Sequence, residues 1–205
     1  MLGNDIVDLQ EVLASGQARR PKFQARICSA AEVRPLQSWF PDEYCTWLLW
    51  AIKESAYKYY IQAGAPPLFA PKKFRFNALN IAAGLVEGYT ETPLGKVRSE
   101  VKLSVAHLTA ESWSISSTKS SIDRKIFPLA ASKQIERSRT LKKLICQQWM
   151  AEMGSTDEEV CIVKDEQQVP SLYQRGQRLP YAISLSHHGA WGFFSYQKEN
   201  SPSLG

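Results

Sequence analysis

Residues Pro41 to Ala63, PDEYCTWLLWAIKESAYKYYIQA, have the pattern of a helix packed against a core. Apolar side chains recur there at steps of three and four, which places them on one helical face. Pro41 and the two acidic residues after it suit a first turn, and Gly64 with the prolines beyond it ends the helix. We therefore expect one long helix over this stretch.

Short alternating segments around this helix predict antiparallel strands. They lie at residues 6–9, 74–76, 101–105 and 113–115. The first of them is unusual because Asp5 and Asp8 accompany it, and a buried strand rarely holds two carboxylates. Residues 116–132, which are rich in serine, predict the junction between two halves of the chain.

The rest of the chain has a second long helix and further strands. The helix is expected at residues 132–153, and Gly154 ends it. Its inward side comprises Ile135, Leu141, Leu144, Ile145, Trp149 and Met153. The strands are expected at 159–163, 181–186 and 191–196. We predict an α+β fold of two similar halves, residues 1–125 and 126–205, each a long helix packed on a small antiparallel sheet.

Composition limits the classes of protein that fit. The 205 residues are 44% apolar and 22% charged, as in soluble globular chains. No apolar run approaches the roughly 20 residues of a membrane span and no signal peptide is recognisable, so we expect a cytoplasmic protein. The four cysteines are too widely spaced for a zinc knuckle or a disulfide framework. The net charge of +5 favours an acidic partner.

One face of the first helix carries Glu54 and Lys58, four positions apart. Such a pair is most often a solvated surface contact worth about 0.2 to 0.5 kcal/mol. The other interpretation is a magnesium site, which needs a second carboxylate because Mg²⁺ takes oxygen ligands from one or two acids. Asp5 is the residue that could supply it. Both interpretations remain open on the helix alone.

The segment Ser184-Leu-Ser186-His187 lies at the end of a predicted strand, just before a predicted turn at His187-His188-Gly189. A tight turn with local hydrogen bonds explains these residues as well as a binding role does. No acid is placed as the third member of a serine hydrolase triad. The chain has no H-E-x-x-H, P-loop or G-x-G-x-x-G motif.

Three motifs together resemble the signature of the 4'-phosphopantetheinyl transferase superfamily. They are Gly3-Asn-Asp5-Ile-Val, Trp50-x-x-Lys53-Glu54-Ser-Ala-x-Lys58 and Ser184-Leu-Ser186-His187. Residues 22–32 are similar to the helix that links the first two motifs in holo-acyl-carrier-protein synthases. The length is closer to the larger surfactin-synthetase-activating type, in which the Ser-His half comes first. Because that half comes last here, the resemblance implies a permuted, monomeric pseudo-two-fold dimer.

The resemblance implies transfer of the phosphopantetheine arm of coenzyme A to a serine of an apo acyl or peptidyl carrier protein, with release of adenosine 3',5'-bisphosphate. Fatty acid or polyketide biosynthesis is the expected setting. Asp5 and Glu54 would hold Mg²⁺ on the pyrophosphate of coenzyme A. Lys58 would contact the same phosphates and steady or protonate the leaving group, while Glu54 would take the serine proton.

The resemblance also implies residues that bind the rest of coenzyme A. Ser186 and His187 match family positions on the adenosine and 3'-phosphate side of the ligand. Arg139 matches an arginine on the same wall, and Lys72 and Lys73 could add positive charge there.

Two positions depart from the family pattern. Relatives of the larger type have a third acid where this chain has Val7, which leaves water or Asp8 for that ligand position. They also have Gly-Lys-Pro where the nearest match here is Gln168-Val169-Pro170, so a phosphate-binding lysine is missing.

A basic segment is expected to dock an acidic carrier protein. It contains Arg19, Arg20, Lys22 and Arg26, with Phe23 and Ile27 as apolar contacts. A solvated charged helix explains this segment equally well. The alternative functions are a catalytically silent docking module and a nucleic-acid-binding module, although the latter lacks interleaved aromatic residues. We expect neither nucleic acid nor a membrane as a partner.

Overall fold

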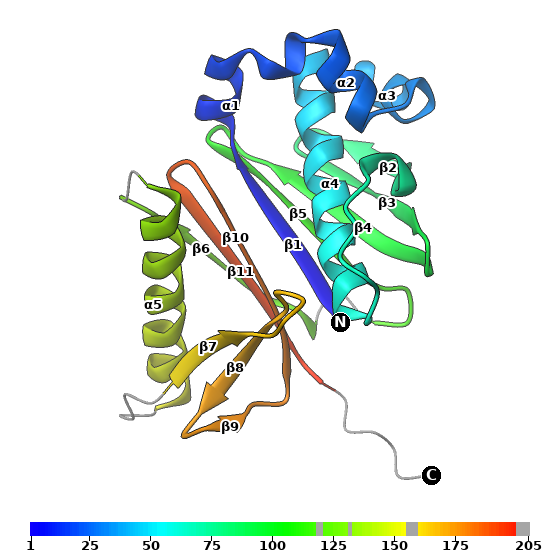
Figure 1. The fold of residues 1–205 in the computed structure, drawn as a ribbon. Coiled ribbons are helices and arrows are strands. Elements are labelled where there is room, and N and C mark those ends of the chain that lie inside the picture. Colours follow the sequence, from blue (N-terminus) through cyan, green and yellow to red (C-terminus); the bar gives the residue numbers. More distant parts are fainter. Residues whose placement is uncertain (118–120, 131–132, 155–159, 200–205) are drawn as a thin grey trace.

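The computed structural model of the chain describes residues 1–117, 121–130, 133–154 and 160–199 (Figure 1). Antiparallel sheets and helices combine in it, which confirms the predicted α+β class. Two long helices lie on either side of the molecule, each against strands (Figure 1). Among the described residues, no helix has the length and hydropathy needed to cross a membrane.

The first sheet is built mainly from the middle of the chain. Its strands are Leu2–Asp8 (β1), Arg75–Ala82 (β2), Leu85–Thr92 (β3), Gly95–Leu103 (β4) and His107–Ser114 (β5), in the order β1-β5-β4-β3-β2. The helices before β2 are Leu9–Ser15 (α1), Pro21–Ile27 (α2), Ala30–Gln37 (α3) and Asp42–Gln62 (α4), with short 3-10 helices at Gln17–Arg19 (η1) and Pro71–Lys73 (η2). Strand β3 is an addition to the strands that the sequence predicted.

Helix α4 is the long helix predicted for residues 41–63, and that prediction is confirmed to within one residue at each end. Leu48, Leu49 and Ile52 are fully buried in the core that α4 forms with the first sheet. Gly64 follows the helix with φ +83°, a left-handed conformation that glycine adopts without strain. The helix crosses β1 and β5, so its inner face meets the first residues of the chain (Figure 1).

The second sheet and its helix come from the last third of the chain. The helix is Gln134–Met153 (α5). The strands are Asp123–Pro128 (β6), Tyr181–His188 (β10) and Trp191–Lys198 (β11), in the order β10-β11-β6. A small third sheet contains Val160–Lys164 (β7), Pro170–Gln174 (β8) and Gln177–Arg178 (β9).

The inner face of α5 is shorter than predicted. Leu141, Ile145 and Trp149 are buried, as expected. Ile135 and Met153 are 68% and 49% exposed, so the prediction that they face inward is wrong. Only the middle turns of the helix meet the core, because its first and last turns extend past it. Residues 132 and 159, at the predicted ends of this helix and of the next strand, lie outside the described ranges.

The predicted boundaries of the second half also need correction. His187 and His188 belong to β10, and the turn falls at Gly189 and Ala190 instead. The predicted junction at 116–132 contains strand β6, although residues 118–120, 131 and 132 are outside the described ranges. The division between residues 125 and 126 therefore falls inside a strand that pairs with β11.

The two larger sheets share an order of strands. In the first sheet, β1 pairs with β5, the last strand in sequence, and β5 pairs with its hairpin partner β4. In the second sheet, β6 pairs with β11, again the last strand, and β11 pairs with its hairpin partner β10. This correspondence supports two similar halves, and the pseudo-two-fold relation between them stays a prediction.

Candidate active site

Gly3 allows β1 to lie directly on the backbone of α4. A Cβ atom at Gly3 would lie 1.9 Å from the Ser55 carbonyl oxygen and 2.6 Å from the Tyr59 amide nitrogen. No side chain fits at these distances, so a residue with a Cβ atom would push the strand away from the helix. The close approach brings Asp5 on β1 beside the motif residues of α4.

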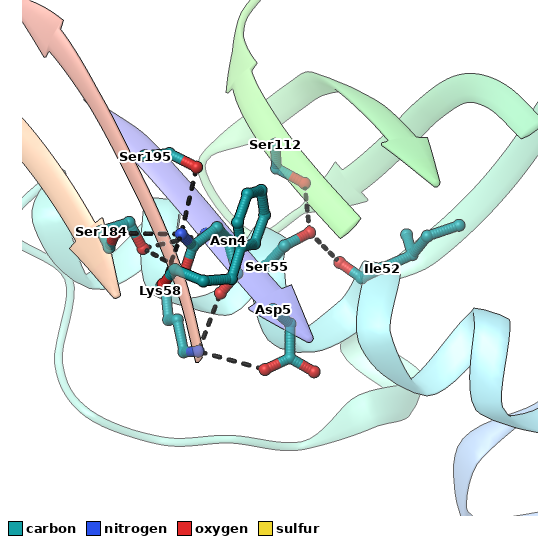
Figure 2. Close-up of polar contacts among 9 residues, drawn as sticks. Asn4, Asp5, Ile52, Ser55, Lys58, Ser112, Ser184 and Ser195 are labelled. Atoms are coloured by element: carbon teal, nitrogen blue, oxygen red, sulfur yellow. Dashed lines mark hydrogen bonds and ion pairs between the residues drawn. The ribbon is translucent and has the colours of Figure 1, made fainter. Parts of the chain in front are cut away.

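Lys58 joins the helix to the strand. Its Nζ atom donates to the Asn4 carbonyl oxygen at 2.8 Å and lies 3.2 Å from Asp5 Oδ1 (Figure 2). The side chains of Lys58 and Asp5 are 30% and 13% exposed, so the ion pair is largely shielded from solvent. The carboxylate paired with Lys58 is therefore that of Asp5, and the local pair with Glu54 considered for the helix alone is not the main contact.

Glu54 and Asp5 are close enough for their charges to interact. Burial raises the pKa of Glu54 to about 7, and the charge of Asp5 acts in the same direction, while Lys58 opposes it. Burial also raises the pKa of Asp5, again against the effect of Lys58. Two carboxylates in a partly buried site, one of which raises the pKa of the other, are a suitable donor pair for a divalent cation.

The donor set fits Mg²⁺ in number as well as in kind. Among the described residues there is no group of three or more His, Cys, Asp or Glu side chains suited to a metal ion. Mg²⁺ usually keeps several water molecules and takes only one or two protein carboxylates, so a pair such as Asp5 and Glu54 would be enough to hold it.

Asp8 is held away from this pair by the backbone. Its Oδ2 accepts from the Ala190 amide at 2.8 Å, and its Oδ1 accepts from the Glu11 amide at 3.2 Å, where it caps α1. Gly189 has φ +54°, and a Cβ atom there would lie 2.1 Å from Asp8 Oδ2. The Asp8 carboxylate therefore stabilises the β10–β11 turn, and Val7, where the larger type has its third acid, is buried.

Ser186 and His187 are neighbours on β10, and positive charge surrounds His187. The Ser186 hydroxyl is buried and has no hydrogen-bond partner among the described residues. Burial lowers the pKa of His187, and the positive charges of Lys58, Arg137 and Lys164 lower it further. Several cations acting on one partly buried imidazole are typical of a site for an anionic ligand, and the unpaired Ser186 hydroxyl separately leaves a hydrogen bond to be made.

A cavity of about 260 Å³ opens between α4, the β7–β8 hairpin and β10. Its lining includes Tyr57, Lys58, Lys164, Gln168, Ser184 and Leu185. The cavity thus combines residues from both halves, and three of them, Lys58, Ser184 and Leu185, belong to the motifs recognised in the sequence.

Three predicted binding residues lie outside this cavity. Arg139 is exposed on α5, and the arginine whose charge acts on His187 is Arg137, one half-turn earlier. Lys72 and Lys73 line a separate surface depression beside Lys96, and neither lines the cavity at Lys58. The roles of Arg139 and Lys73 toward coenzyme A stay predictions.

Lys53 has a structural role that the motif alone did not reveal. Its Nζ atom is fully buried and contacts Glu32 Oε1 at 2.8 Å and the Ile27 carbonyl oxygen at 2.6 Å. A signal was available, because Leu49, Lys53 and Ala56 share one helical face and the first and last of these are apolar. A charged residue on an apolar face indicates a buried partner.

The basic segment before α4 is only partly free. Arg19 Nε contacts Glu43 Oε1 at 2.6 Å. The Phe23 ring packs against Trp47 with centroids 5.3 Å apart. Ile27 is 1% exposed and packs in the core, so it cannot serve as an apolar contact for a partner and that prediction is wrong. Its position at the end of α2, facing α4, accounts for the burial.

Comparison with known families gives one match. Residues 1–117 match the model of the 4'-phosphopantetheinyl transferase superfamily, a range that contains β1 and α4. No curated protein and no solved structure matches the chain.

Proposed function

Since this chain belongs to the 4'-phosphopantetheinyl transferase superfamily, whose members transfer phosphopantetheine, we propose that its acceptor is a serine of an apo acyl or peptidyl carrier protein. The donor is coenzyme A, the reaction depends on Mg²⁺, and the second product is adenosine 3',5'-bisphosphate. The enzyme is then of the holo-acyl-carrier-protein synthase type. The observation that carries the proposal is the meeting of Asp5, Glu54 and Lys58 where β1 crosses α4.

Asp5 and Glu54 would hold the Mg²⁺ ion. The ion would supply Lewis-acid stabilisation of the charge on the pyrophosphate during transfer. The Lys58 ammonium adds positive charge at the same place, and its bonds to Asn4 and Asp5 keep it oriented.

The bonds and the proton of the phosphopantetheine transfer can be accounted for with residues of this site. The serine oxygen of the carrier protein forms a bond to the phosphorus that carries pantetheine, and the bond from that phosphorus to the bridging oxygen breaks. Glu54, directly or through water, takes the serine proton, a role that a carboxylate within reach of the acceptor hydroxyl can fill. Lys58 steadies or protonates the leaving phosphate.

The remainder of coenzyme A would lie toward the second half of the chain. Ser186 and His187 would contact the adenosine and 3'-phosphate side, and Arg139 and Lys73 would add positive charge. The unpaired Ser186 hydroxyl and the cations that act on His187 support this orientation.

An acidic carrier protein would dock near Arg19, Arg20, Lys22, Phe23 and Arg26. The exposure of Arg20, Lys22 and Arg26 on and beside α2 supports this surface. We further propose a cytoplasmic monomer in which the two predicted halves, with their division moved from between residues 125 and 126 to before β6, are fused, so that no second subunit is needed to complete the site.

The test is mass spectrometry of an apo carrier protein incubated with coenzyme A and Mg²⁺. Wild-type protein should add one phosphopantetheine to the carrier. Asp5→Asn and Glu54→Gln should each lower the rate by at least about a hundredfold, because each removes a charge that acts in the transition state.

Glu136→Gln is the matched control, because Glu136 is an exposed acid on α5. It should transfer at the wild-type rate. An absence of any mass gain across fatty-acid, polyketide and peptide carrier proteins would refute the proposed function.

A further inference from the structure

We propose that Lys164 binds a phosphate group of coenzyme A in the cavity between α4 and the β7–β8 hairpin, and so replaces the lysine that the Gln168-Val169-Pro170 segment lacks. The inference rests on the proposed function, since coenzyme A is the ligand. It assigns a binding role to a residue that lies outside all three sequence motifs.

The backbone of the β7–β8 hairpin supports matching Gln168-Val169-Pro170 to the Gly-Lys-Pro segment of the larger type. Gln168 has φ +65°, a left-handed conformation that favours glycine, so it occupies the place of the glycine in Gly-Lys-Pro. Val169 then occupies the place of the lysine. Lys164 is the direct partner of Pro170 across the β7–β8 pair, and Lys164 and Val169 line the same cavity.

Lys164 also shares its surroundings with other cations. It lines the same cavity as Lys58. Partial burial of the ammonium group lowers the pKa of Lys164, and the charges of Lys142 and Lys58 lower it further. His187 lies close enough for Lys164 to act on its pKa as well. The charges of Lys58, Lys142 and Lys164 are thus close enough to act on one another or on His187.

The nearest acid does not neutralise this charge. Asp165 Oδ1 accepts from the Val169 amide at 2.9 Å, which uses that carboxylate oxygen to close the hairpin loop. Among the described residues, no acidic side chain forms an ion pair with Lys164. Lys58 is paired with Asp5, whereas Lys164 has no such partner in the described part of the chain, so a ligand with several phosphate charges would offset the repulsion that acts on Lys164.

The experiment measures binding and does not depend on turnover. Dissociation constants of coenzyme A are determined by calorimetry for wild type, Lys164→Met, Lys164→Arg and Lys143→Met, at two salt concentrations. Lys164→Met should weaken binding at least about tenfold and lessen its dependence on salt, because one charge-assisted contact is lost. Lys164→Arg should stay within about threefold of wild type, because the positive charge is kept.

Lys143 is exposed on α5 next to Lys142, so Lys143→Met controls for a general loss of positive charge. Repeating the titrations with 3'-dephospho-coenzyme A identifies the phosphate. If the effect of Lys164→Met disappears, Lys164 binds the 3'-phosphate, and if it persists, Lys164 binds the pyrophosphate. Equal affinity and salt dependence of Lys164→Met and wild type would overturn the inference alone, whereas wild type that neither binds nor transfers would overturn the proposed function.

Discussion

Glu54 shows how one residue can serve the site at the expense of the fold. Its ordinary pKa is 4.5, and burial together with the charge of Asp5 raises the pKa to about 7 in the folded chain. The folded state therefore holds a proton that the unfolded state releases between these two values. As pH rises through about 7 the folded chain must ionise this buried carboxyl, so the stability that the bound proton provided is lost.

Glu54→Gln should stabilise the metal-free protein at pH 8 and have little effect near pH 4.5. Each unit of pKa shift corresponds to about 1.4 kcal/mol, and after a discount for solvent screening we expect a gain of about 2 kcal/mol at pH 8. Urea denaturation in the presence of a chelator at several pH values measures it, with Glu136→Gln as the control. A gain that is the same at both pH values would contradict the assigned cause.

Helix α4 has three faces with separate roles. Leu48 and Ile52 bury their side chains in the core, while Glu54 and Lys58 lie toward β1. Lys53 extends in another direction to Glu32, whose carboxylate also accepts from the Ser29 hydroxyl and the Phe76 amide. The buried ion pair between Lys53 and Glu32 therefore connects α4 to α3 and β2. Lys53 is the residue directly before the proposed base, Glu54.

Lys53→Met should lower the free energy of unfolding by about 3 kcal/mol, because it leaves Glu32 buried with an uncompensated charge. The double variant Lys53→Met with Glu32→Gln removes that charge and should recover part of the loss. Urea denaturation of both single variants and the double variant measures the coupling. Strictly additive losses would show that the two side chains do not act as a pair.

The two halves of the molecule meet through buried polar groups. Asn4 on β1 is fully buried, and its amide group donates to the Ser184 carbonyl oxygen at 2.9 Å and to Ser195 Oγ at 3.1 Å (Figure 2). Gln62 Nε2 adds a bond to the Ile183 carbonyl oxygen at 2.7 Å. Directional bonds of this kind fix how β1 lies against β10, and the cavity that holds Lys58 and Ser184 depends on that placement.

Asn4→Ala should therefore affect both stability and binding. We expect a loss of about 3 kcal/mol, because buried partners on β10 and β11 lose their hydrogen bonds, together with faster amide exchange along β10. Coenzyme A affinity should fall as well, since the cavity spans both halves. Asn77→Ala, at an exposed position on β2, is the control. Unchanged exchange along β10 would show that Asn4 does not join the halves.

Strong local patterns were enough to predict several helices and strands. The periodicity of residues 41–63 predicted α4, and the alternation near residues 181–196 predicted β10 and β11. These patterns record which side of a helix or strand is buried, and neighbouring residues carry that information. The residues of the three motifs likewise indicated the 4'-phosphopantetheinyl transferase superfamily, and the match over residues 1–117 confirms that prediction.

Only the tertiary structure decided which of these elements meet. Asn4 and Ser184 are bonded although 180 positions separate them, and Lys164 faces Lys58 from a hairpin that no motif includes. The burial of Ile27 also depends on tertiary structure, because it results from the packing of α2 against α4. Such contacts follow from the packing of whole sheets and helices against each other, and no pattern of neighbouring residues encodes them.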